Sequence, residues 1–484
     1  MSTTNTIQIA LGEESPLGTP ATEMELIRLT GETVTLRNSF ITSEEIRADR
    51  QPRGDTLVDA EVTGQINFYL TYGGQDERIA GAFMSSWTRT PSKDNGPTAD
   101  SQITGVTAST NTIAVDAGGA SFKAGMLVRT TGFTNAGNNG TFKVASSTAT
   151  TIVLAGTPGL ADESAPPAKA RIKVVGFEGE AGGLEASSTG LFAATIDLTT
   201  MGILKGDRLK IGGTDSGTKF ATAALNTWVR VAAAPTTNAI VLDQRPSGWT
   251  TDNGAAKTIR VWFGNRLRNG ATKRAWTLEK GFMSHTPPSY LVFNALMMGG
   301  MTIEVKPGTQ VTGNFPVSGT KANSPTTTPI DSTPSDPPDT GIMNGVTDVG
   351  MLAEGGNPLQ TPNYITEFTF VLNNNLLQGK AVGVLGSAVV EPGPLSVTGN
   401  LTTYFGDTAI WAKIVGNTKT SLMIVLKKDN QSYVLDLPAV RLRGDAPAAT
   451  RTNEWATINS SYVAEYDAAM GYTAQISQFE YFEA

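Results

Sequence analysis

The sequence contains no cysteine and only one histidine, His285, among 484 residues. The absence of cysteine excludes disulfides, thiolate nucleophiles and cysteine-based metal sites, and it is compatible with assembly in a reducing cytoplasm. His285 lies in the segment Met283 to Pro288, which is more typical of a polar turn than of a catalytic triad. Phosphate-binding glycine loops and the His-Glu-x-x-His motif are also missing. We therefore expect no enzyme activity and no cofactor.

Acidic residues do not form a recognisable metal-binding loop. A calcium site needs several oxygen ligands at regular short spacing, and no such loop is visible in the chain. Turn chemistry explains the isolated aspartates more simply. The candidates considered are Asp116, Asp197, Asp207 and Asp243.

Positive charge is scarce. The chain has 37 Lys and Arg against 44 Asp and Glu, a formal net charge of −7. A protein that binds DNA regardless of sequence needs a dense surplus of Lys and Arg to neutralise phosphates. Mild like-charge repulsion instead suits a surface past which double-stranded DNA moves without specific binding.

Long apolar runs are missing too. Residues Met1 to Ala10 have neither the basic start nor the apolar core of a signal peptide, and the longest apolar run, Leu422 to Leu426, cannot span a bilayer. We expect no membrane insertion, and we expect the chain to be made and folded in the cytosol.

A strand-then-helix cassette occurs twice. In the first copy Val62-Thr63-Gly64 opens a strand with alternating apolar residues, and a helical pattern follows from Asp76 to Met84. In the second copy Val397-Thr398-Gly399 opens a similar strand, and a helix is expected between Asp407 as N-cap and Gly416 as C-cap. A third such phrase at Val311 is either a chance match or a closing strand. The repeated order indicates a duplicated building block.

The most charged stretch runs from Ser43 to Asp55 and alternates in sign. It is either a solvated loop or an arm that orders against a neighbouring subunit through salt bridges. On the second interpretation it makes inter-ring or inter-subunit contacts. The residues concerned are Glu44, Glu45, Arg47, Asp49, Arg50, Arg53 and Asp55.

An internal repeat lies within residues 98–257, where Gly, Ala, Ser and Thr dominate. Strand-like runs recur in the same order in two halves, which predicts a pair of small β modules inserted at an exposed loop and projecting outward. Phe142 and Trp228 occupy matching positions in the two modules and are the weak candidates for surface binding.

Strand patterns resume beyond the insertion, and short strands bounded by Gly and Pro indicate a mainly β protein. Residues 321–343 are rich in Pro, Thr and Ser and predict an extended linker.

Set end to end, the segments outside the insertion resemble the tail tube proteins (major tail proteins) of long-tailed bacteriophages. The similarity depends on the order of several short strand phrases rather than on any one of them. These phrases are Val62 to Met84, Trp276 to Phe282, Met301 to Val305, Val311 to Phe315, Thr366 to Asn374, Val397 to Leu401 and Leu437 to Leu442.

The resemblance implies two β-sandwich domains that form a barrel with their neighbours, each with a short helix, plus the inserted pair of modules. The expected division is 1–97 with 258–320 as the first tube domain, 98–257 as the insertion, 321–343 as the linker and 344–484 as the second tube domain. Six such folds make a ring, so we expect homotrimeric rings with pseudo-sixfold symmetry. The implied location is the virion tail, with assembly in the cytoplasm of the host bacterium. The implied partners are the tape measure, tail tip and tail terminator proteins.

Two other functions remain open from the residues alone. One is a host-surface or glycan-binding adhesin or decoration protein that uses the inserted modules. The other is a polysaccharide-degrading enzyme, which would need paired carboxylates such as Glu13 and Glu14, or Glu178 and Glu180, to converge in a groove.

Overall fold

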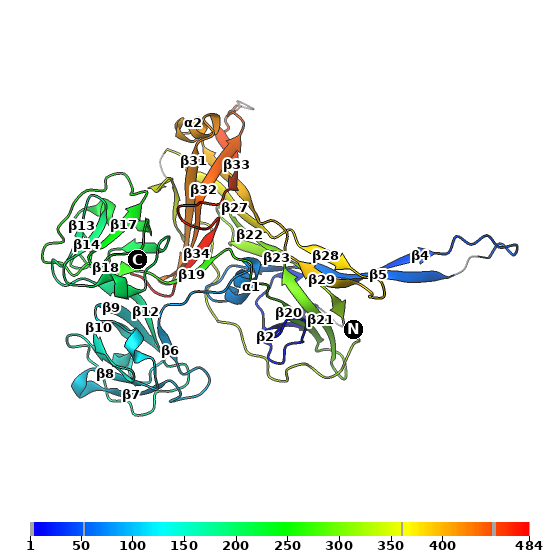
Figure 1. Ribbon diagram of the computed structural model, residues 1–484, viewed down its shortest axis with the longest axis horizontal. Coiled ribbons are helices and arrows are strands. Elements are labelled where there is room, and N and C mark those ends of the chain that lie inside the picture. The colour runs from blue at the N-terminus through cyan, green and yellow to red at the C-terminus, as the bar shows by residue number, and fades with distance from the viewer. Residues whose placement is uncertain (1–3, 52–53, 360–361, 448–451, 484) are drawn as a thin grey trace.

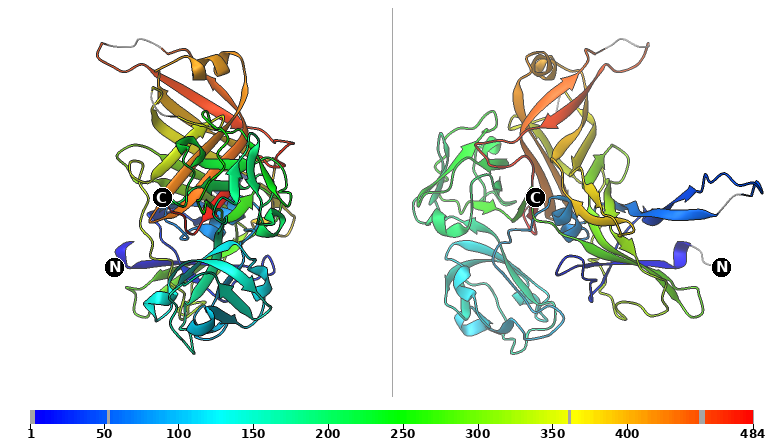
Figure 2. Two further views of the ribbon diagram at one scale, coloured as in Figure 1. Left: turned by 90° about the vertical axis from the view of Figure 1, so that its left-hand side faces the viewer. Right: turned by 45° about the vertical axis from the view of Figure 1, so that its right-hand side comes forward.

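The structure is a computed structural model that describes residues 4–51, 54–359, 362–447 and 452–483. It has a β-rich body, an inserted domain on one side of that body, and a long hairpin on the opposite side (Figures 1 and 2). The described residues include two short α-helices, α1 (Asp76–Ala82) and α2 (Ala409–Val415). The expectation of a mainly β fold is confirmed.

The body is one extended sheet of 19 strands. Its strands are β1 (Ile7–Glu13), β2 (Glu25–Leu26), β3 (Gly31–Glu32), β4 (Thr35–Thr42), β5 (Asp55–Tyr69), β19 (Asn265–Arg268), β20 (Trp276–Phe282), β21 (Ser289–Met298), β22 (Gly300–Val305), β23 (Thr312–Gly319), β24 (Lys321–Ala322), β25 (Val349–Glu354), β26 (Asn357–Pro358), β27 (Ile365–Asn373), β30 (Ser396–Tyr404), β31 (Lys419–Lys428), β32 (Gln431–Gly444), β33 (Thr457–Ala464) and β34 (Gln475–Phe479).

The inserted domain is a second sheet of 13 strands. Its strands are β6 (Ser92–Asp94), β7 (Ile103–Thr107), β8 (Thr112–Val115), β9 (Met126–Thr131), β10 (Gly140–Ser147), β11 (Thr151–Leu154), β12 (Arg171–Glu178), β13 (Leu184–Ala186), β14 (Gly190–Ala193), β15 (Arg208–Ile211), β16 (Trp228–Val231), β17 (Ala239–Asp243) and β18 (Arg260–Trp262).

Smaller elements complete the fold. A separate hairpin consists of β28 (Leu377–Lys380) and β29 (Ser387–Glu391). The single-turn 3-10 helices are Thr4–Thr6, Ala108–Thr110, Gly119–Ser121, Ala136–Asn138, Leu198–Met201 and Ala223–Leu225.

Both predicted cassettes form as a strand followed by a helix. β5 leads to α1, and β30 leads to α2. Alternate residues of β5, including Ile66 and Phe68, are buried as the period of two requires. At α2 the Asp407 carboxylate accepts a hydrogen bond from the Ala409 N–H at 2.9 Å, although Thr408 is the residue that flanks the helix, and Gly416 follows it.

The two halves of the body have the same strand order. In the first half the order is β1-β20-β21-β23-β5-β4, and in the second it is β25-β31-β32-β33-β30-β27. The third Val-Thr-Gly phrase is therefore no chance match. It leads into β23, which pairs with β5 from Thr312 to Gly319 and lies between β21 and β5 in the first half.

The halves are joined edge to edge by β22 and β27. Their antiparallel register runs from Gly300 opposite Asn373 to Val305 opposite Phe368. A side chain at Gly300 would force the backbone to shift, because a Cβ there would lie 2.1 Å from the Leu372 carbonyl oxygen. Close approach of two backbones thus requires glycine at this point of the junction.

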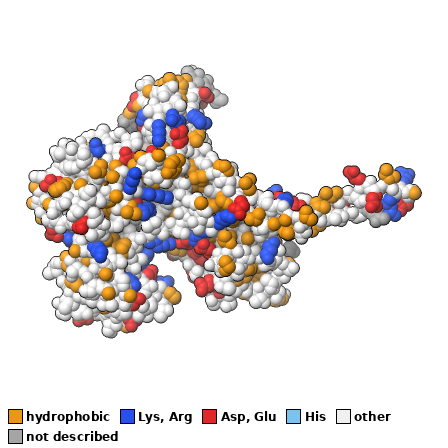
Figure 3. Space-filling model, in the orientation of Figure 1, with side chains coloured by type: hydrophobic (Ala, Val, Ile, Leu, Met, Phe, Trp, Pro, Cys, Tyr) orange, Lys and Arg blue, Asp and Glu red, His pale blue; other side chains and the backbone are white. Residues whose placement is uncertain are grey.

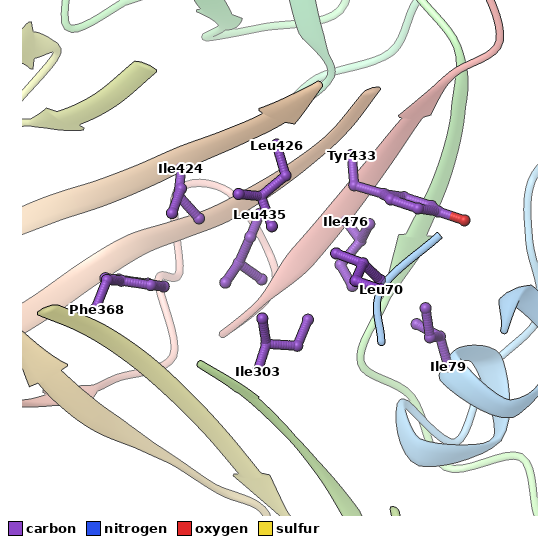
Figure 4. Close-up of a pocket in the computed structure, with 9 residues that line it drawn as sticks. All are labelled: Leu70, Ile79, Ile303, Phe368, Ile424, Leu426, Tyr433, Leu435 and Ile476. Atoms are coloured by element: carbon purple, nitrogen blue, oxygen red, sulfur yellow. The ribbon is translucent and has the colours of Figure 1, made fainter. Parts of the chain in front are cut away.

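One apolar core runs through both halves. A dry cavity of about 20 Å³ lies at their boundary and is lined only by apolar atoms (Figure 4). Its lining residues are Leu70, Ile79 and Ile303 from the first half and Phe368, Ile424, Leu426, Tyr433, Leu435 and Ile476 from the second. Neither half buries these side chains alone.

The segment predicted as a linker is extended and lies against the first half. Isolated bridges join Thr326 to Tyr290, Ser335 to Glu25 and Ile342 to Thr71. The Arg28 guanidinium donates to the carbonyl oxygens of Pro338, at 3.2 Å, and Thr340, at 2.6 Å. Polar contacts hold most of the segment, and Met343 at its end is buried in the apolar core.

The two inserted modules share one sheet. β12 and β18 pair from Gly176 opposite Trp262 to Glu178 opposite Arg260, and the strands of the two modules continue on either side of this pair. The sheet begins at Ser92 and ends at Trp262, so it extends past both ends of residues 98–257.

A buried ionic cluster fastens the insertion to the second half. The Asp436 carboxylate on β32 is fully buried and accepts hydrogen bonds from the guanidiniums of Arg208 and Arg230, the latter at 3.1 Å, and from the Tyr472 hydroxyl at 2.7 Å. Burial by itself raises the pKa of Asp436, but the two guanidiniums outweigh it and hold that pKa below its ordinary value.

Aromatic side chains also pack in the interface between the insertion and the second half. The Trp228 ring lies edge-on to Phe479 and Phe482, with centroids 4.8 and 5.3 Å away. Excision of residues 98–257 would remove both arginines and uncover these phenylalanines, leaving an exposed apolar patch. The insertion is thus an integral part of the subunit rather than an independent appendage.

Asp436→Asn tests the ionic cluster. Removing one partner of a buried pair leaves the arginines uncompensated, and we expect the free energy of unfolding to fall by about 3–5 kcal/mol in denaturant titrations. The control is Asp49→Asn, which breaks an exposed pair with Arg47 and should leave the free energy of unfolding nearly unchanged.

The pH dependence of the same variant follows from the lowered pKa of Asp436. A carboxyl with a depressed pKa in the folded state stabilises the protein above its unfolded pKa of about 3.9, and the effect is lost as the pH falls through the folded pKa. The stability difference between wild type and Asp436→Asn should be constant from pH 7 to about pH 5 and shrink below about pH 4. A constant difference down to pH 2 would contradict this assignment.

Gly300→Ala tests the junction between the halves. The added methyl group meets backbone, which cannot rotate away, so we expect a loss of about 1–3 kcal/mol in unfolding free energy. Gly31→Ala is the matched control, because no atom lies within 4 Å of a Cβ at Gly31. Equal stability of the two variants would contradict a close backbone approach at β22 and β27.

Candidate assembly surfaces

The hairpin of β4 and β5 projects from the body as an arm (Figures 1 and 2). Its register runs from Thr35 opposite Thr63 to Thr42 opposite Asp55, and all eight residues of β4 are exposed. Within the described residues β4 pairs only with β5, so its outer edge has free N–H and C=O groups. Such an edge is a template for pairing with another chain.

The predicted charged residues gather at the tip of this arm (Figure 3). Glu44, Glu45, Arg47, Asp49 and Arg50 lie in the loop between the strands, and Asp55 begins β5. Arg53 lies outside the described residues. The structure thus brings the described members of the set together on one exposed loop.

Local contacts hold part of this loop. Arg47 and Asp49 form an ion pair at 2.5 Å, and the hydrogen bond from Arg47 lowers the pKa of Asp49. The Asp55 carboxylate accepts a hydrogen bond from the Thr42 hydroxyl at 2.6 Å. Both contacts are exposed, so they contribute little stability to the isolated subunit and leave the tip charges accessible to a partner.

Sequence reasoning missed an apolar surface on the shaft of the arm. Phe40, Ile41, Leu57 and Val58 are exposed, and Ile46 is exposed in the loop beyond them. Large apolar side chains rarely gather in water on a monomeric protein unless they form a contact surface. The sequence did contain one signal for this surface. The strand pattern from Leu36 to Ile41 lies next to a charged loop, in a segment that has no buried partner.

The candidate binding residues of the inserted modules do not form a surface. Trp228 is only 7% exposed, because it packs into the interface with the second half. The prediction of surface binding by Trp228 is therefore wrong. Phe142 is half-buried against the core of its own module.

The paired carboxylates do not converge in a groove. Glu13 pairs with Arg274, Glu178 with Arg260 and Glu180 with Lys143. The Glu14 carboxylate accepts hydrogen bonds from the Thr277 hydroxyl and the Ala295 N–H. Each carboxylate thus has a structural partner, and the glycosidase interpretation receives no support.

The isolated aspartates and the histidine also have structural contacts. Asp116 pairs with Lys93, Asp207 with Arg266, and Asp243 with Arg230, while Asp197 accepts from the Thr199 N–H. His285 stacks on Phe282 and shares a hydrogen bond with Ser289. In the part of the chain that the structure describes, no cluster of His, Asp or Glu is suited to a metal ion.

Among the described residues, no helix has the length and apolar composition needed to cross a membrane.

Comparison with known proteins gives one family. A search of curated proteins finds no match. A family model described as "Phage tail tube protein" matches residues 4–202 and 159–461, which together span most of the chain and agree with a duplicated tube domain. The β-rich fold, the repeated strand order of the two halves and this match together show that the chain belongs to the phage tail tube protein family and is a structural component of a phage tail.

Proposed function

We propose that this chain is the repeating subunit of a phage tail tube. Three copies close into a pseudo-sixfold ring, and the rings stack around a channel that encloses the tape measure protein and conducts double-stranded DNA to the host. Residues 1–97 with 258–320 supply one tube domain of each subunit and 344–484 supply the other. Residues 98–257 are carried on the side away from the arm, with 321–343 as the connection.

The observation that supports this proposal is the junction of β22 with β27. Within one chain it joins two halves of the same strand order through their sheet edges. β4 occupies in the first half the place that β27 occupies in the second, but its outer edge is open. If the same junction forms between neighbouring copies, it pairs the outer edge of β4 with another chain. In a closed ring every such edge is then paired.

Charge and composition fit the same role. The net charge of −7 disfavours tight binding of the passing DNA, and a chain without cysteine folds in the reducing cytoplasm of the host bacterium. The subunit acts without catalysis or cofactor in this proposal. Tail tip and tail terminator proteins would contact the two ends of the finished tube.

The charged tip of the arm provides contact between rings. Its exposed charges of both signs can pair with complementary charges on the ring beneath, so that each added ring orders the tips of the last. The alternative of a glycan-binding adhesin is weaker, because Trp228, one of the two residues on which it depended, is buried.

The subunit count is measured by cryo-electron microscopy of tubes grown from the full chain. We expect six tube domains around the axis and three inserted domains per ring, because each chain has two halves and one insertion. Six insertions per ring would contradict the trimer, and a monomer with all sheet edges covered would contradict the tube.

Neutralising the tip tests contact between rings. We expect a variant with Glu44→Gln, Glu45→Gln, Arg47→Gln and Arg50→Gln to elongate tubes more slowly by light scattering, because exposed ion pairs between rings are lost. Elongation of the wild type should also slow as salt rises from about 0.05 to 0.5 M, since screening shortens the reach of exposed charges.

The control variant neutralises Lys123, Asp162 and Lys169, which are exposed on the insertion. It should elongate at the wild-type rate. If the tip variant and the wild type elongate at equal rates with the same salt dependence, the tip does not contribute to the contact between rings.

A further inference from the structure

The first strands of two hairpins share a sequence pattern. Thr35 to Thr42 reads TLRNSFIT and Val371 to Gln378 reads VLNNNLLQ, so Leu36, Asn38 and Phe40 align with Leu372, Asn374 and Leu376. The strand register supports this alignment independently. Leu36 lies opposite Val62, and Leu372 lies opposite Val397, the first residue of the second Val-Thr-Gly phrase.

In the second half this pattern is docked inside the chain. Leu372 is 1% exposed, and the buried Asn374 side chain donates to the carbonyl oxygens of Ala82, at 2.8 Å, and Met298, at 3.3 Å. Leu376 packs against an apolar cluster that includes Met84. The hairpin from β27 to β30 therefore covers the C-terminal end of α1.

In the first half the same pattern has no partner in the described chain. Leu36 is 37% exposed and Phe40 is 58% exposed. Asn38 is also exposed.

The end of α2 is uncovered in the same way. α1 ends at Ala82 and α2 ends at Val415, and two positions later each chain segment has a residue in the left-handed conformation, Met84 and Asn417 respectively. Ala82 is 0% and Met84 3% exposed under the docked hairpin, whereas Val415 is 68% exposed and Asn417 is also exposed. Five residues of α1 are buried, but only Ile410 of α2 is. One half thus has a covered helix end, and the other has the bare equivalent.

We infer that the shaft of the arm of one copy docks on the C-terminal end of α2 in a neighbouring copy of the same ring. This inference rests on the proposed function. Phe40 takes the place of Leu376, covering Val415, while Asn38 donates to main-chain carbonyls at the end of α2 as Asn374 does at α1. The arm shaft then holds neighbours within a ring, and the charged tip beyond it reaches the next ring.

A second copy of this chain is the occupant that the structure favours. The proposed contact repeats an interface already present inside the chain, between elements of the same order and the same residue pattern. The arm points away from the body, so it is placed to reach another molecule (Figure 2). A ring can close only if every half uses the same interface on both of its sides.

Cross-linking of the full chain tests the contact. Because the sequence has no cysteine, Phe40→Cys and Val415→Cys each introduce a single thiol. The two single variants are mixed, concentrated until tubes form, and treated with a short bis-maleimide. We expect a cross-linked dimer only in the mixture, and in the double variant a ladder that ends at the trimer.

Two control pairs accompany the cross-linking experiment. Phe192→Cys places a thiol at an exposed phenylalanine of the insertion and should give no dimer with Val415→Cys. Met84 follows α1 and Leu376 lies in the docked hairpin, where it packs against the cluster that contains Met84. The pair Met84→Cys and Leu376→Cys should therefore cross-link within one chain, and the product should keep the mass of a monomer.

The outcomes separate this inference from the proposed function. Tubes that form without a link between positions 40 and 415 would overturn the docking and leave the tube proposal intact. A link within single chains at high dilution would overturn it too, because the arm would then fold back on its own chain. A chain that stays monomeric and unlinked at every concentration would overturn both.

Substitution of Phe40 gives a second measurement. Phe40→Asp should leave the melting temperature of the monomer unchanged, because the side chain is exposed there, and raise the concentration needed for tubes by about tenfold or more. Phe40→Leu, which introduces the residue found at position 376, should restore tube formation. Equal tube formation by Phe40→Asp and the wild type would contradict the docking.

Discussion

Unpaired backbone at the edges of β-sheets is the constraint on which the rest of this structure depends. A strand edge leaves N–H and C=O groups that must be bonded, shielded or paired with another chain. This protein bonds one such edge internally, where β22 meets β27, and leaves the equivalent edge of β4 open. Duplication within one chain therefore completes one junction during folding, and in the proposed ring the open edge forms the next junction with another copy. One apolar core cluster contains residues of both halves.

The insertion is held by a different kind of interaction. Asp436 has no access to water and depends on Arg208 and Arg230, which lie far from it in the sequence. A buried charge requires its partners in one geometry, so the cluster specifies how the inserted domain sits on the second half. Trp228 and the phenylalanines beside it add apolar area. Orientation of the insertion is thereby a property of the folded subunit.

The two halves differ mainly in what covers them. The same hairpin pattern is buried at Leu372 and exposed at Leu36, and the same helix end is buried at Ala82 and exposed at Val415. In the proposed ring, the exposed members of these pairs are the surfaces that contact another copy, because exposed apolar surface is stabilised when it is covered.

The sequence by itself determined the local elements: both strand-then-helix cassettes, the repeated strands of the insertion, the extended 321–343 segment and the charged loop at Glu44 to Asp55. These depend on the period of apolar residues and on turn chemistry, which are properties of neighbouring residues. Only the tertiary structure decided that Trp228 is buried, that β23 lies between β21 and β5, that Asp436 meets two arginines, and that Phe40 is exposed while Leu376 packs against an apolar cluster. Those outcomes depend on which distant surfaces meet, and a tryptophan or an aspartate in a strand has the same local pattern whether it faces water or another domain.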